Sequence, residues 1–345
     1  MPHPTSPNSA RVTIAVPTYN GGPYLRDCLN NILEQTFQDY DVLISDNGST
    51  DQSSEIAREF AARDSRFRYF KQPRHLEAAP HFSSLPALAT SPMFIWHSDD
   101  DVWGKNYLEV LVGLLDANPH AQLAVGDYVT EYMDAPRRRV VQAFQEFGPG
   151  TADRMRELSQ FPAGWIYGLF RTAGLQKIAE VIHDRFPLTR GWDLLVVFHY
   201  CLNNQVVGSR ETNFTWRCYS DQSLSRDLAA GIEAHMWSRH ASRAHLKTIG
   251  GKLAYEIKHA RAKAIKKIAK VDYMIGARRL FFAIASEWIA EKSLPPVEAL
   301  WWRLYLWQFM ARRIYPARKA VKYKILRMLF GTSMPDTYSA HLPKS

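Results

Sequence analysis

Along residues 11–130, short apolar runs alternate with stretches in which apolar residues recur at helical spacing. The helical stretches begin near Pro23, Thr50 and Leu108, and each presents one apolar face. The predicted strands are the runs 12–16, 41–45, 67–70, 93–96 and 122–125. Strands separated by helices predict an α/β fold, with a mostly parallel central sheet covered by helices on both faces.

The pattern changes after residue 130. Residues 131–235 show a helical stretch near 175–181, another over 194–200, and an alternating strand over 206–216. Residues 236–330 are helical and basic, with an apolar stripe among lysines and arginines. We expect residues 1–10 and 331–345 to be flexible ends. This pattern predicts one α/β body followed by a basic helical region.

Composition supports a folded body with a distinct C-terminal part. The chain has 345 residues and is 46% hydrophobic, which is enough for a substantial core. Its net charge of +9 is uneven, because residues 1–235 carry seven excess acidic groups and residues 236–330 sixteen excess basic ones. An acidic body and a basic segment suggest two different tasks.

Cysteine usage and hydropathy bear on the compartment. The three cysteines form no CxxC pair, which argues against a disulfide scaffold or zinc site and fits a reducing compartment. Residues 1–10 lack the apolar segment of a secretory signal. No stretch approaches the roughly 18–20 apolar residues that a membrane-spanning helix needs. We therefore expect a cytoplasmic protein.

Polar clusters follow three of the predicted strands. They are residues 17–20, residues 46–49, and the triplet Asp99-Asp100-Asp101. In parallel sheets, ligands bind beyond the carboxyl ends of the strands, so the three clusters are expected to converge on one cleft. Three adjacent carboxylates suit a hard divalent cation that also binds phosphate oxygens. The alternative is a solvated acidic turn that caps the next helix.

The segments 16–22, 44–51 and 98–103 resemble three motifs of glycosyltransferase family 2 in both order and spacing. The resemblance is clear over residues 11–130, weaker to 226 and absent beyond. It implies the GT-A fold, a Rossmann-like α/β architecture, with inverting transfer from a nucleotide-activated sugar. On this resemblance, residues 11–130 form the nucleotide-sugar-binding half of the domain and residues 131–235 form the acceptor-binding half.

The resemblance also implies which residues contact the donor. Asp46 would accept a hydrogen bond from the base, although an Asx turn over 46–48 is the structural alternative. Arg217 would pair with the diphosphate, with a plain salt bridge as its alternative. The implied nucleotide-sugar contacts are Pro17, Thr18, Tyr19, Asn20, Asp46, Asn47, Arg74, Asp99 and Arg217.

For the metal, alignment on Trp103 places Ser98 where the family usually has its first aspartate. The resemblance then implies that Asp99 contacts the ribose and that Asp100 binds Mn²⁺ or Mg²⁺ bridging the diphosphate. Asp101 is expected on the metal side, as a second ligand or a supporting carboxylate. The ion would stabilise charge on the departing nucleotide.

Inverting transfer needs a general base for the acceptor hydroxyl. The segment 190–195 resembles the family's base-bearing segment, which makes Asp193 the candidate. Its structural alternative is the N-cap of the helix 194–200. The resemblance implies that Trp165, Tyr167 and Trp192 contact the acceptor, although each of these aromatics also suits the core.

Residues 236–330 are basic and rich in aromatic residues, and three interpretations of this region were considered. An anionic membrane surface is favoured. A subdomain packed on the body with a solvated basic face is the structural alternative, and nucleic acid is unlikely. We expect a peripheral protein at the inner face of the cytoplasmic membrane.

The motifs together predict an inverting, metal-dependent glycosyltransferase. It would move a sugar from a nucleotide diphosphate sugar, most simply a UDP-sugar, to a hydroxyl of a glycan or lipid-linked glycan in cell-surface polysaccharide synthesis. One alternative is a catalytically degenerate GT-A protein that binds glycan or a partner. The other is a different nucleotide-sugar enzyme such as a nucleotidyltransferase, although residues 19–22 are too short for its usual glycine-rich phosphate loop.

Overall fold

The chain divides into two compact units in the computed structural model. The first comprises Met1–Pro187 and Trp192–Ser220, and the second comprises Leu188–Gly191 and Asp221–Ser345. The described residues are 10–133, 138–148, 157, 161–186, 191–218, 280–294, 296, 299–300, 302–304 and 306. The predicted sites all lie in the first unit.

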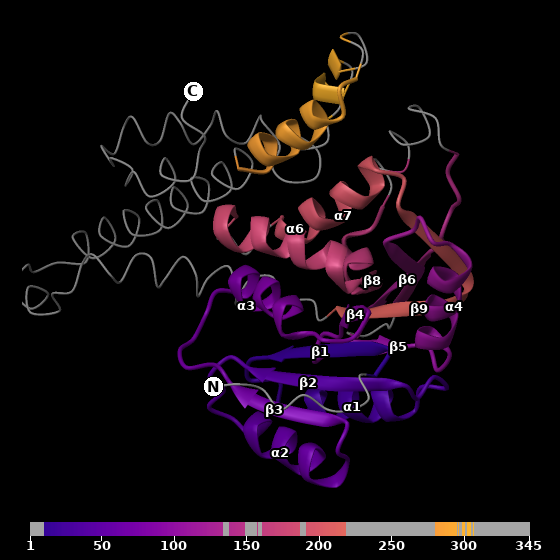
Figure 1. Ribbon diagram of the computed structural model, residues 1–345. Helices are drawn as coiled ribbons and strands as arrows, with labels where there is room; N and C mark the ends of the chain where they lie inside the picture. Colours follow the sequence, from indigo (N-terminus) through magenta and orange to yellow (C-terminus); the bar gives the residue numbers. More distant parts are fainter. Residues whose placement is uncertain are drawn as a thin grey trace, which may run out of the picture. The chain divides into compact units, whose positions relative to one another are not determined.

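The first unit alternates strands and helices as the hydrophobic pattern predicts, and all five strands predicted over residues 11–130 are present (Figure 1). Its amino-terminal elements are β1 (Val12–Thr18), α1 (Gly22–Leu33), β2 (Tyr40–Asp46), α2 (Ser53–Arg63), β3 (Phe67–Lys71), α3 (Ala78–Ser84), β4 (Met93–Trp96), β5 (Val102–Trp103), α4 (Tyr107–Ala117) and β6 (Leu123–Tyr132). They continue with β7 (Arg138–Gln142), the 3₁₀ turn η2 (Ala163–Tyr167), β8 (Leu169–Arg171), α6 (Thr172–Arg185), α7 (Trp192–Leu202) and β9 (Val206–Cys218).

One sheet runs through the unit in the order β3-β2-β1-β4-β8-β6-β9-β5, with β7 paired to β6. The four strands β3, β2, β1 and β4 are parallel. Beyond β4 the sheet is mixed, because β8 is antiparallel to both its neighbours while β6 and β9 are parallel. The α/β class and central sheet are confirmed, while the mostly parallel character holds only for the β3-β2-β1-β4 half.

Helices cover both faces of the parallel half, as alternation along the strands requires. On one face, Val12, Ile14 and Val16 of β1 join a buried core with apolar residues of α1 and α2. On the other, the Trp96 indole donates to the Phe82 carbonyl of α3 at 3.1 Å. Figure 1 shows α6 and α7 on the opposite side of β1 from α2.

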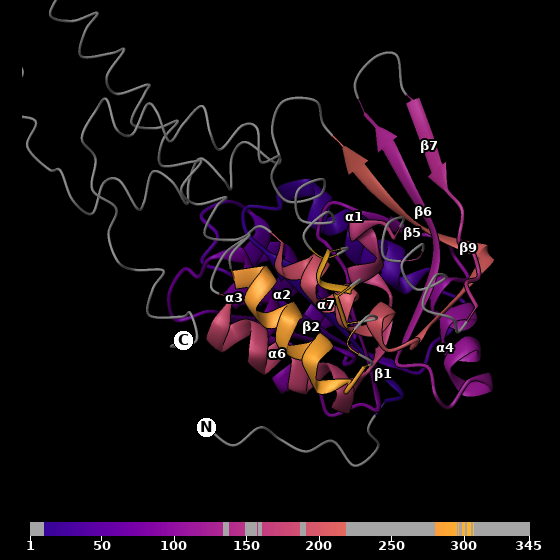
Figure 2. The ribbon, with the colours of Figure 1, turned by 90° about the horizontal axis from the view of Figure 1, so that it is seen from above.

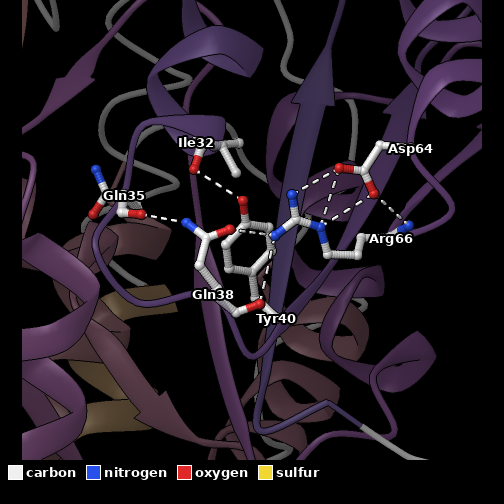
Figure 3. Close-up of polar contacts among 6 residues, drawn as sticks. All are labelled: Ile32, Gln35, Gln38, Tyr40, Asp64 and Arg66. Carbon is white, nitrogen blue, oxygen red and sulfur yellow. Dashed lines mark hydrogen bonds and ion pairs between the residues drawn. The ribbon is translucent and has the colours of Figure 1, made fainter.

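A polar network ties the starts of β2 and β3 to the end of α1 (Figure 3). The Tyr40 hydroxyl donates to the Ile32 carbonyl at 3.1 Å, and the Arg66 guanidinium lies 4.5 Å from the centre of the Tyr40 ring. Arg66 also donates to Gln38 Oε1 at 2.7 Å and to Asp64 Oδ2 at 2.7 Å. These contacts lie at the amino ends of the strands, opposite the edge expected to bind ligand.

The mixed half extends as a ribbon in which β7, β6 and β9 lie side by side (Figure 2). β6 crosses residue 130, so the sheet is continuous across the expected boundary between the two halves. The predicted strand 206–216 is β9, the helical stretch 175–181 lies in α6, and the stretch 194–200 lies in α7.

In the second unit, a helix spans 280–291, where Leu280, Ile284 and Trp288 recur at four-residue spacing and are buried. Among the described residues, no helix is long and apolar enough to cross a membrane. The apolar stripe over 253–268, the ends 1–9 and 331–345, and the 235/236 boundary lie outside the described residues.

Candidate active site

Hydrogen bonds join the loops after β1 and β2 to each other. The Asn47 amide donates to the Thr18 carbonyl at 2.9 Å. The Asn20 backbone N–H donates to Ser49 Oγ at 3.0 Å, and the Thr50 backbone N–H donates to Asn20 Oδ1 at 2.9 Å. Asn20 adopts φ of 55°, a left-handed conformation that asparagine tolerates better than most residues. Its side chain therefore braces the loops in addition to any contact with nucleotide.

The loop after β4 joins this pair through the Asp triplet. Thr18 Oγ1 donates to Asp99 Oδ2 at 2.5 Å. Any side chain at Gly21 would overlap the Asp99 carboxylate, so only glycine permits the approach. Pro17 is buried within β1 and offers the site no exposed surface. The predicted convergence of three polar loops at the carboxyl ends of β1, β2 and β4 is therefore observed.

The three carboxylates have different surroundings. Asp99 and Asp100 are half-buried, and Asp100 Oδ1 accepts a hydrogen bond from Ser98 Oγ at 2.6 Å. Asp101 is buried, and its Oδ1 accepts the Arg217 backbone amide of β9 at 2.9 Å. The helix-capping alternative is wrong, because β5 follows the triplet and α4 begins only at Tyr107.

Beneath the triplet lies a buried polar support that the sequence did not reveal. The His97 ring lies 4.0 Å from the Trp103 ring, and its Nδ1–H donates to the Ser98 carbonyl at 2.8 Å. Burial lowers the pKa of His97 to about 3, so the ring is neutral. Asn31 clamps the Trp103 backbone, accepting its amide at 2.8 Å and donating to its carbonyl at 3.0 Å. In the sequence, the signal for this buried support was a histidine directly after the apolar run 93–96.

From the mixed half, Tyr167 and Asp193 approach the triplet. Burial together with the charges of Asp101, Asp100 and Asp193 raises the pKa of the Tyr167 phenol well above the ordinary value. These four acidic or phenolic groups thus share one region. α7 begins at Trp192, two residues before the predicted start at 194, so Asp193 lies inside the first helical turn and not at the N-cap.

A model of the family described as Glycosyl transferase family 2 matches residues 13–189, which is half of the chain. The chain belongs to glycosyl transferase family 2. It is 33% identical over 119 residues to Glycosyltransferase GlyA of Streptococcus pneumoniae, covering 34% of this chain and 17% of GlyA. It is 32% identical over 120 residues to GlyG of the same organism, covering 35% of this chain and 40% of GlyG.

The chain thus spans less than half the length of these two relatives. Among solved structures, S. aureus TarS 1–349 in complex with UDP-GlcNAc aligns with a TM-score of 0.58. The two share 16% sequence identity, and the alignment covers 96% of this chain and 84% of TarS 1–349. At that identity the likeness shows the fold, which is the GT-A fold expected from the motifs.

In this family 2 chain, the acidic triplet fits a hard divalent ion. Burial and the neighbouring Asp100 charge raise the pKa of Asp99 to about 7, and burial raises that of Asp101 well above its usual range. A cation would neutralise this excess negative charge. The described residues include no group of three or more His, Cys, Asp or Glu arranged to hold a metal.

Asp46 is fully buried, and both of its carboxylate oxygens accept hydrogen bonds from the protein. Oδ1 accepts the amides of Gly48 at 3.1 Å and Ser49 at 2.7 Å. Oδ2 accepts Ser54 Oγ at 2.5 Å and the Tyr69 hydroxyl at 3.0 Å. Burial opposes ionisation, but the bonds from Ser54 and Ser49 outweigh it and lower the pKa of Asp46. The Asx-turn alternative describes this conformation, and the base contact stays a prediction.

Asn47 fastens the loop after β3 beside the donor loops. Its side chain accepts the Leu76 amide and donates to the Leu76 carbonyl, both at 2.8 Å. His75 donates to the Asn47 carbonyl at 3.0 Å, and its ring centre lies 4.5 Å from that of Tyr19. Tyr19 and Arg74 are exposed there, as ligand contacts require. The sequence did not single out His75.

Arg217 lies against the triplet on the β9 side. Its Nη1 is 4.0 Å from Asp27 Oδ2, which makes a long ion pair. Its Nε is buried and has no hydrogen-bond partner among the residues that the structure describes. Because the ion pair with Asp27 is long, the salt-bridge alternative has little support. The Nε–H of Arg217 can still donate to the predicted diphosphate.

The structure corrects two of the predicted acceptor contacts. Trp165 is 5% exposed, with the Phe144 ring at 5.9 Å. Trp192 is 6% exposed, with the rings of Phe82 at 5.4 Å and Trp96 at 5.9 Å. Neither indole has an open face for a sugar, so both belong to the core, as the alternative held. Tyr167 is half-buried and remains in reach of the site.

Proposed function

We propose that the chain is an inverting, divalent-metal-dependent glycosyltransferase that uses a nucleotide diphosphate sugar. The observation that carries this proposal is the Thr18–Asp99 hydrogen bond, which joins the end of β1 to the acidic loop after β4, while the backbone bond from Asn47 to Thr18 attaches the loop after β2. The family of the chain supports the reaction class. The alternative of a non-catalytic binding protein is an outcome of the test below.

On the donor side, the chain's own residues bind and orient the diphosphate sugar. Asp99, held by Thr18, faces the ribose, and Asp100, held by Ser98, provides the carboxylate for Mn²⁺ or Mg²⁺. The bound ion supplies Lewis-acid stabilisation of the departing diphosphate. The buried Nε of Arg217 donates to a phosphate oxygen.

On the acceptor side, Asp193 acts as general base. It takes the proton of the acceptor hydroxyl while that oxygen forms a bond to the anomeric carbon of the sugar. The bond from the anomeric carbon to the diphosphate oxygen breaks on the opposite side, so the configuration inverts. Support comes from Tyr167, whose pKa is raised by burial and by the charges of Asp101, Asp100 and Asp193. The base and the metal-side carboxylates therefore flank one region.

For the donor we propose a UDP-sugar and for the acceptor a glycan or lipid-linked glycan of a cell-surface polysaccharide. TarS, whose fold this chain shares, has been solved with UDP-GlcNAc, and this supports the UDP donor. The basic excess in residues 236–330 supports a peripheral position on an anionic membrane surface, where such an acceptor would lie.

A thermal-shift panel of nucleotide-sugars, with and without Mn²⁺, tests this proposal. Ligands that bind only the native state raise its melting temperature. We expect a UDP-sugar with Mn²⁺ to raise Tm by several degrees and to be turned over or slowly hydrolysed. A binding protein would show the shift without turnover, and Asp193→Ala would then change nothing. The proposal fails if no nucleotide-sugar shifts Tm or is consumed under any condition.

A further inference from the structure

The loop between β3 and α3 is fastened along the end of β2. At its start, the Gln72 backbone N–H donates to the Asp46 carbonyl at 2.7 Å. Further along, the Asn47 side chain accepts the Leu76 backbone N–H and donates to the Leu76 carbonyl, both at 2.8 Å. His75 lies between these two anchors. Its backbone therefore has a defined place beside the loop after β2.

The His75 ring is held as well as its backbone. Its Nδ1 lies 3.0 Å from the Asn47 carbonyl oxygen, which can only accept, so Nδ1 carries a proton and donates it. Asn47 is 4% exposed, and its backbone N–H donates to the Thr18 carbonyl at 2.9 Å. The carbonyl that orients the imidazole thus belongs to a buried and hydrogen-bonded part of the site.

Tyr19, in the loop after β1, lies against this imidazole. The two ring centres are 4.5 Å apart, and the ring planes are tilted by 52°. The neighbours of Tyr19 fix its backbone, because the Thr18 side chain bonds Asp99 and the Asn20 backbone N–H bonds the loop after β2. The Tyr19 side chain is nevertheless 49% exposed. The phenol ring therefore combines a fixed backbone, a supporting imidazole and a large open surface.

We propose that His75 is a positioning residue for the nucleobase, which holds the Tyr19 ring in the orientation in which the base stacks on it. The inference rests on the proposed function, because it takes the nucleotide to bind between the loops after β1 and β2. Every base has a π-face, so stacking on an aromatic ring needs no hydrogen bond to the base. Stacking suits this site, because both Asp46 oxygens already accept hydrogen bonds from the protein.

Support from the imidazole should raise affinity by ordering the ring in advance. An exposed tyrosine without a neighbour samples several rotamers, and a ligand that binds it must immobilise the side chain at a cost in affinity. With the His75 ring in contact, part of that ordering is complete before the nucleotide binds. The loop after β3 then contributes to nucleotide affinity through Tyr19, without a contact of its own with the diphosphate.

The test is a set of UDP affinities measured by calorimetric titration in saturating Mn²⁺. His75→Ala removes the supporting ring, and we expect UDP affinity to fall about threefold to tenfold, the cost of immobilising one side chain. His75→Phe keeps a ring beside Tyr19 and loses the Nδ1 bond, so affinity should stay within about twofold of the wild type. His120→Ala is the matched control, because His120 is an exposed histidine in the loop before β6. It should bind UDP as the wild type does.

A double-mutant cycle shows whether His75 acts through Tyr19. Tyr19→Ala should weaken UDP binding by about fivefold or more, because base stacking is lost. The variant with both changes should bind UDP no more weakly than Tyr19→Ala alone.

The inference is overturned if His75→Ala or Tyr19→Ala binds UDP as the wild type does, or if the two losses add. It is also overturned if His75→Phe binds as weakly as His75→Ala, since the hydrogen bond and not the ring would then be responsible. Wild type that binds no nucleotide refutes the proposed function itself.

Discussion

The two halves of the sheet build the candidate site in different ways. In the parallel half, β3-β2-β1-β4, short loops at adjacent strand ends bind one another directly, as Asn20 does with Ser49 and Thr18 with Asp99. In the mixed half, single side chains reach the site from separated segments. The link between the halves at Asp101 joins residues 116 positions apart, through the Arg217 amide.

Each half of the sheet therefore determines a different part of the chemistry. The loops at the carboxyl ends of adjacent parallel strands lie close together regardless of how the connecting helices pack. The sheet topology therefore determines the donor side of the site. The acceptor side depends on how η2, α7 and β9 pack, which sequence-distant contacts decide. We therefore expect donor-side changes to alter nucleotide and metal binding, and acceptor-side changes to alter turnover.

The largest effect should come from Asp100→Asn in the parallel half. Replacing the metal-side carboxylate by an amide should lower Mn²⁺-dependent turnover about 1,000-fold, since the ion's stabilisation is worth several kcal/mol. Steady-state rates over a Mn²⁺ titration measure the loss. Asp116→Asn is the control, because Asp116 is exposed and pairs with Arg11 far from the site. Equal rates for the two variants would rule out the assigned role.

In the mixed half, Asp193→Asn should lower kcat about 100-fold and leave UDP-sugar affinity unchanged, because a general base acts on the acceptor proton. Transfer kinetics together with calorimetric titration of UDP-sugar separate the two quantities. The exposed Asp184→Asn in α6 serves as the control. A variant that keeps kcat but loses donor affinity would place Asp193 on the donor side. It would also contradict the expected difference between the two halves of the sheet.

Within the parallel half, Thr18→Val removes the link between the β1 loop and the triplet. A hydrogen bond to a charged group contributes about 2 kcal/mol, so urea unfolding should show a loss near that size. UDP affinity should fall about tenfold as well, since Asp99 loses its support. Thr13→Val is the matched control on the same strand, because Thr13 donates to Asp41 at 2.8 Å away from the site. It should lose stability without losing UDP affinity.

The smallest effect concerns pH. His81 Nε2 lies 2.8 Å from Ser45 Oγ, and burial lowers the pKa of His81 to about 4. The unfolded chain binds this proton near pH 6.5, so stability that is complete above that pH is lost as pH falls towards 4. We expect His81 to account for about 1 kcal/mol of the loss between pH 6.5 and 5.5. Urea unfolding of His81→Gln at both values should show that much less dependence on pH.

Much of the parallel half was predictable from the sequence, because strand runs and helical faces have clear periods. The strand-end clusters then placed Thr18, Asp46 and the Asp triplet. The mixed half was harder, since the two-residue β5 and three-residue β8 exist only through pairing with distant strands. Neither burial of Trp165 nor that of Trp192 could be predicted, because an aromatic suits both a core and a sugar site.

Side-chain bonding within the loops also escaped prediction. The sequence indicated that Asp46 could form an Asx turn but not that Ser54 and Tyr69 would occupy its second oxygen. Ser98 appeared only as a departure from a pattern, and the structure shows that its hydroxyl donates to Asp100 Oδ1 at 2.6 Å. Local rules identify such residues, and only the folded chain reveals their partners.

The most direct test is to locate Mn²⁺ by anomalous X-ray scattering in crystals of the protein grown with UDP. We expect one strong peak about 2.1 Å from a carboxylate oxygen of Asp100, with UDP between the loops after β1 and β2. A manganese peak bound away from the Asp triplet, or UDP bound outside these loops, would contradict it.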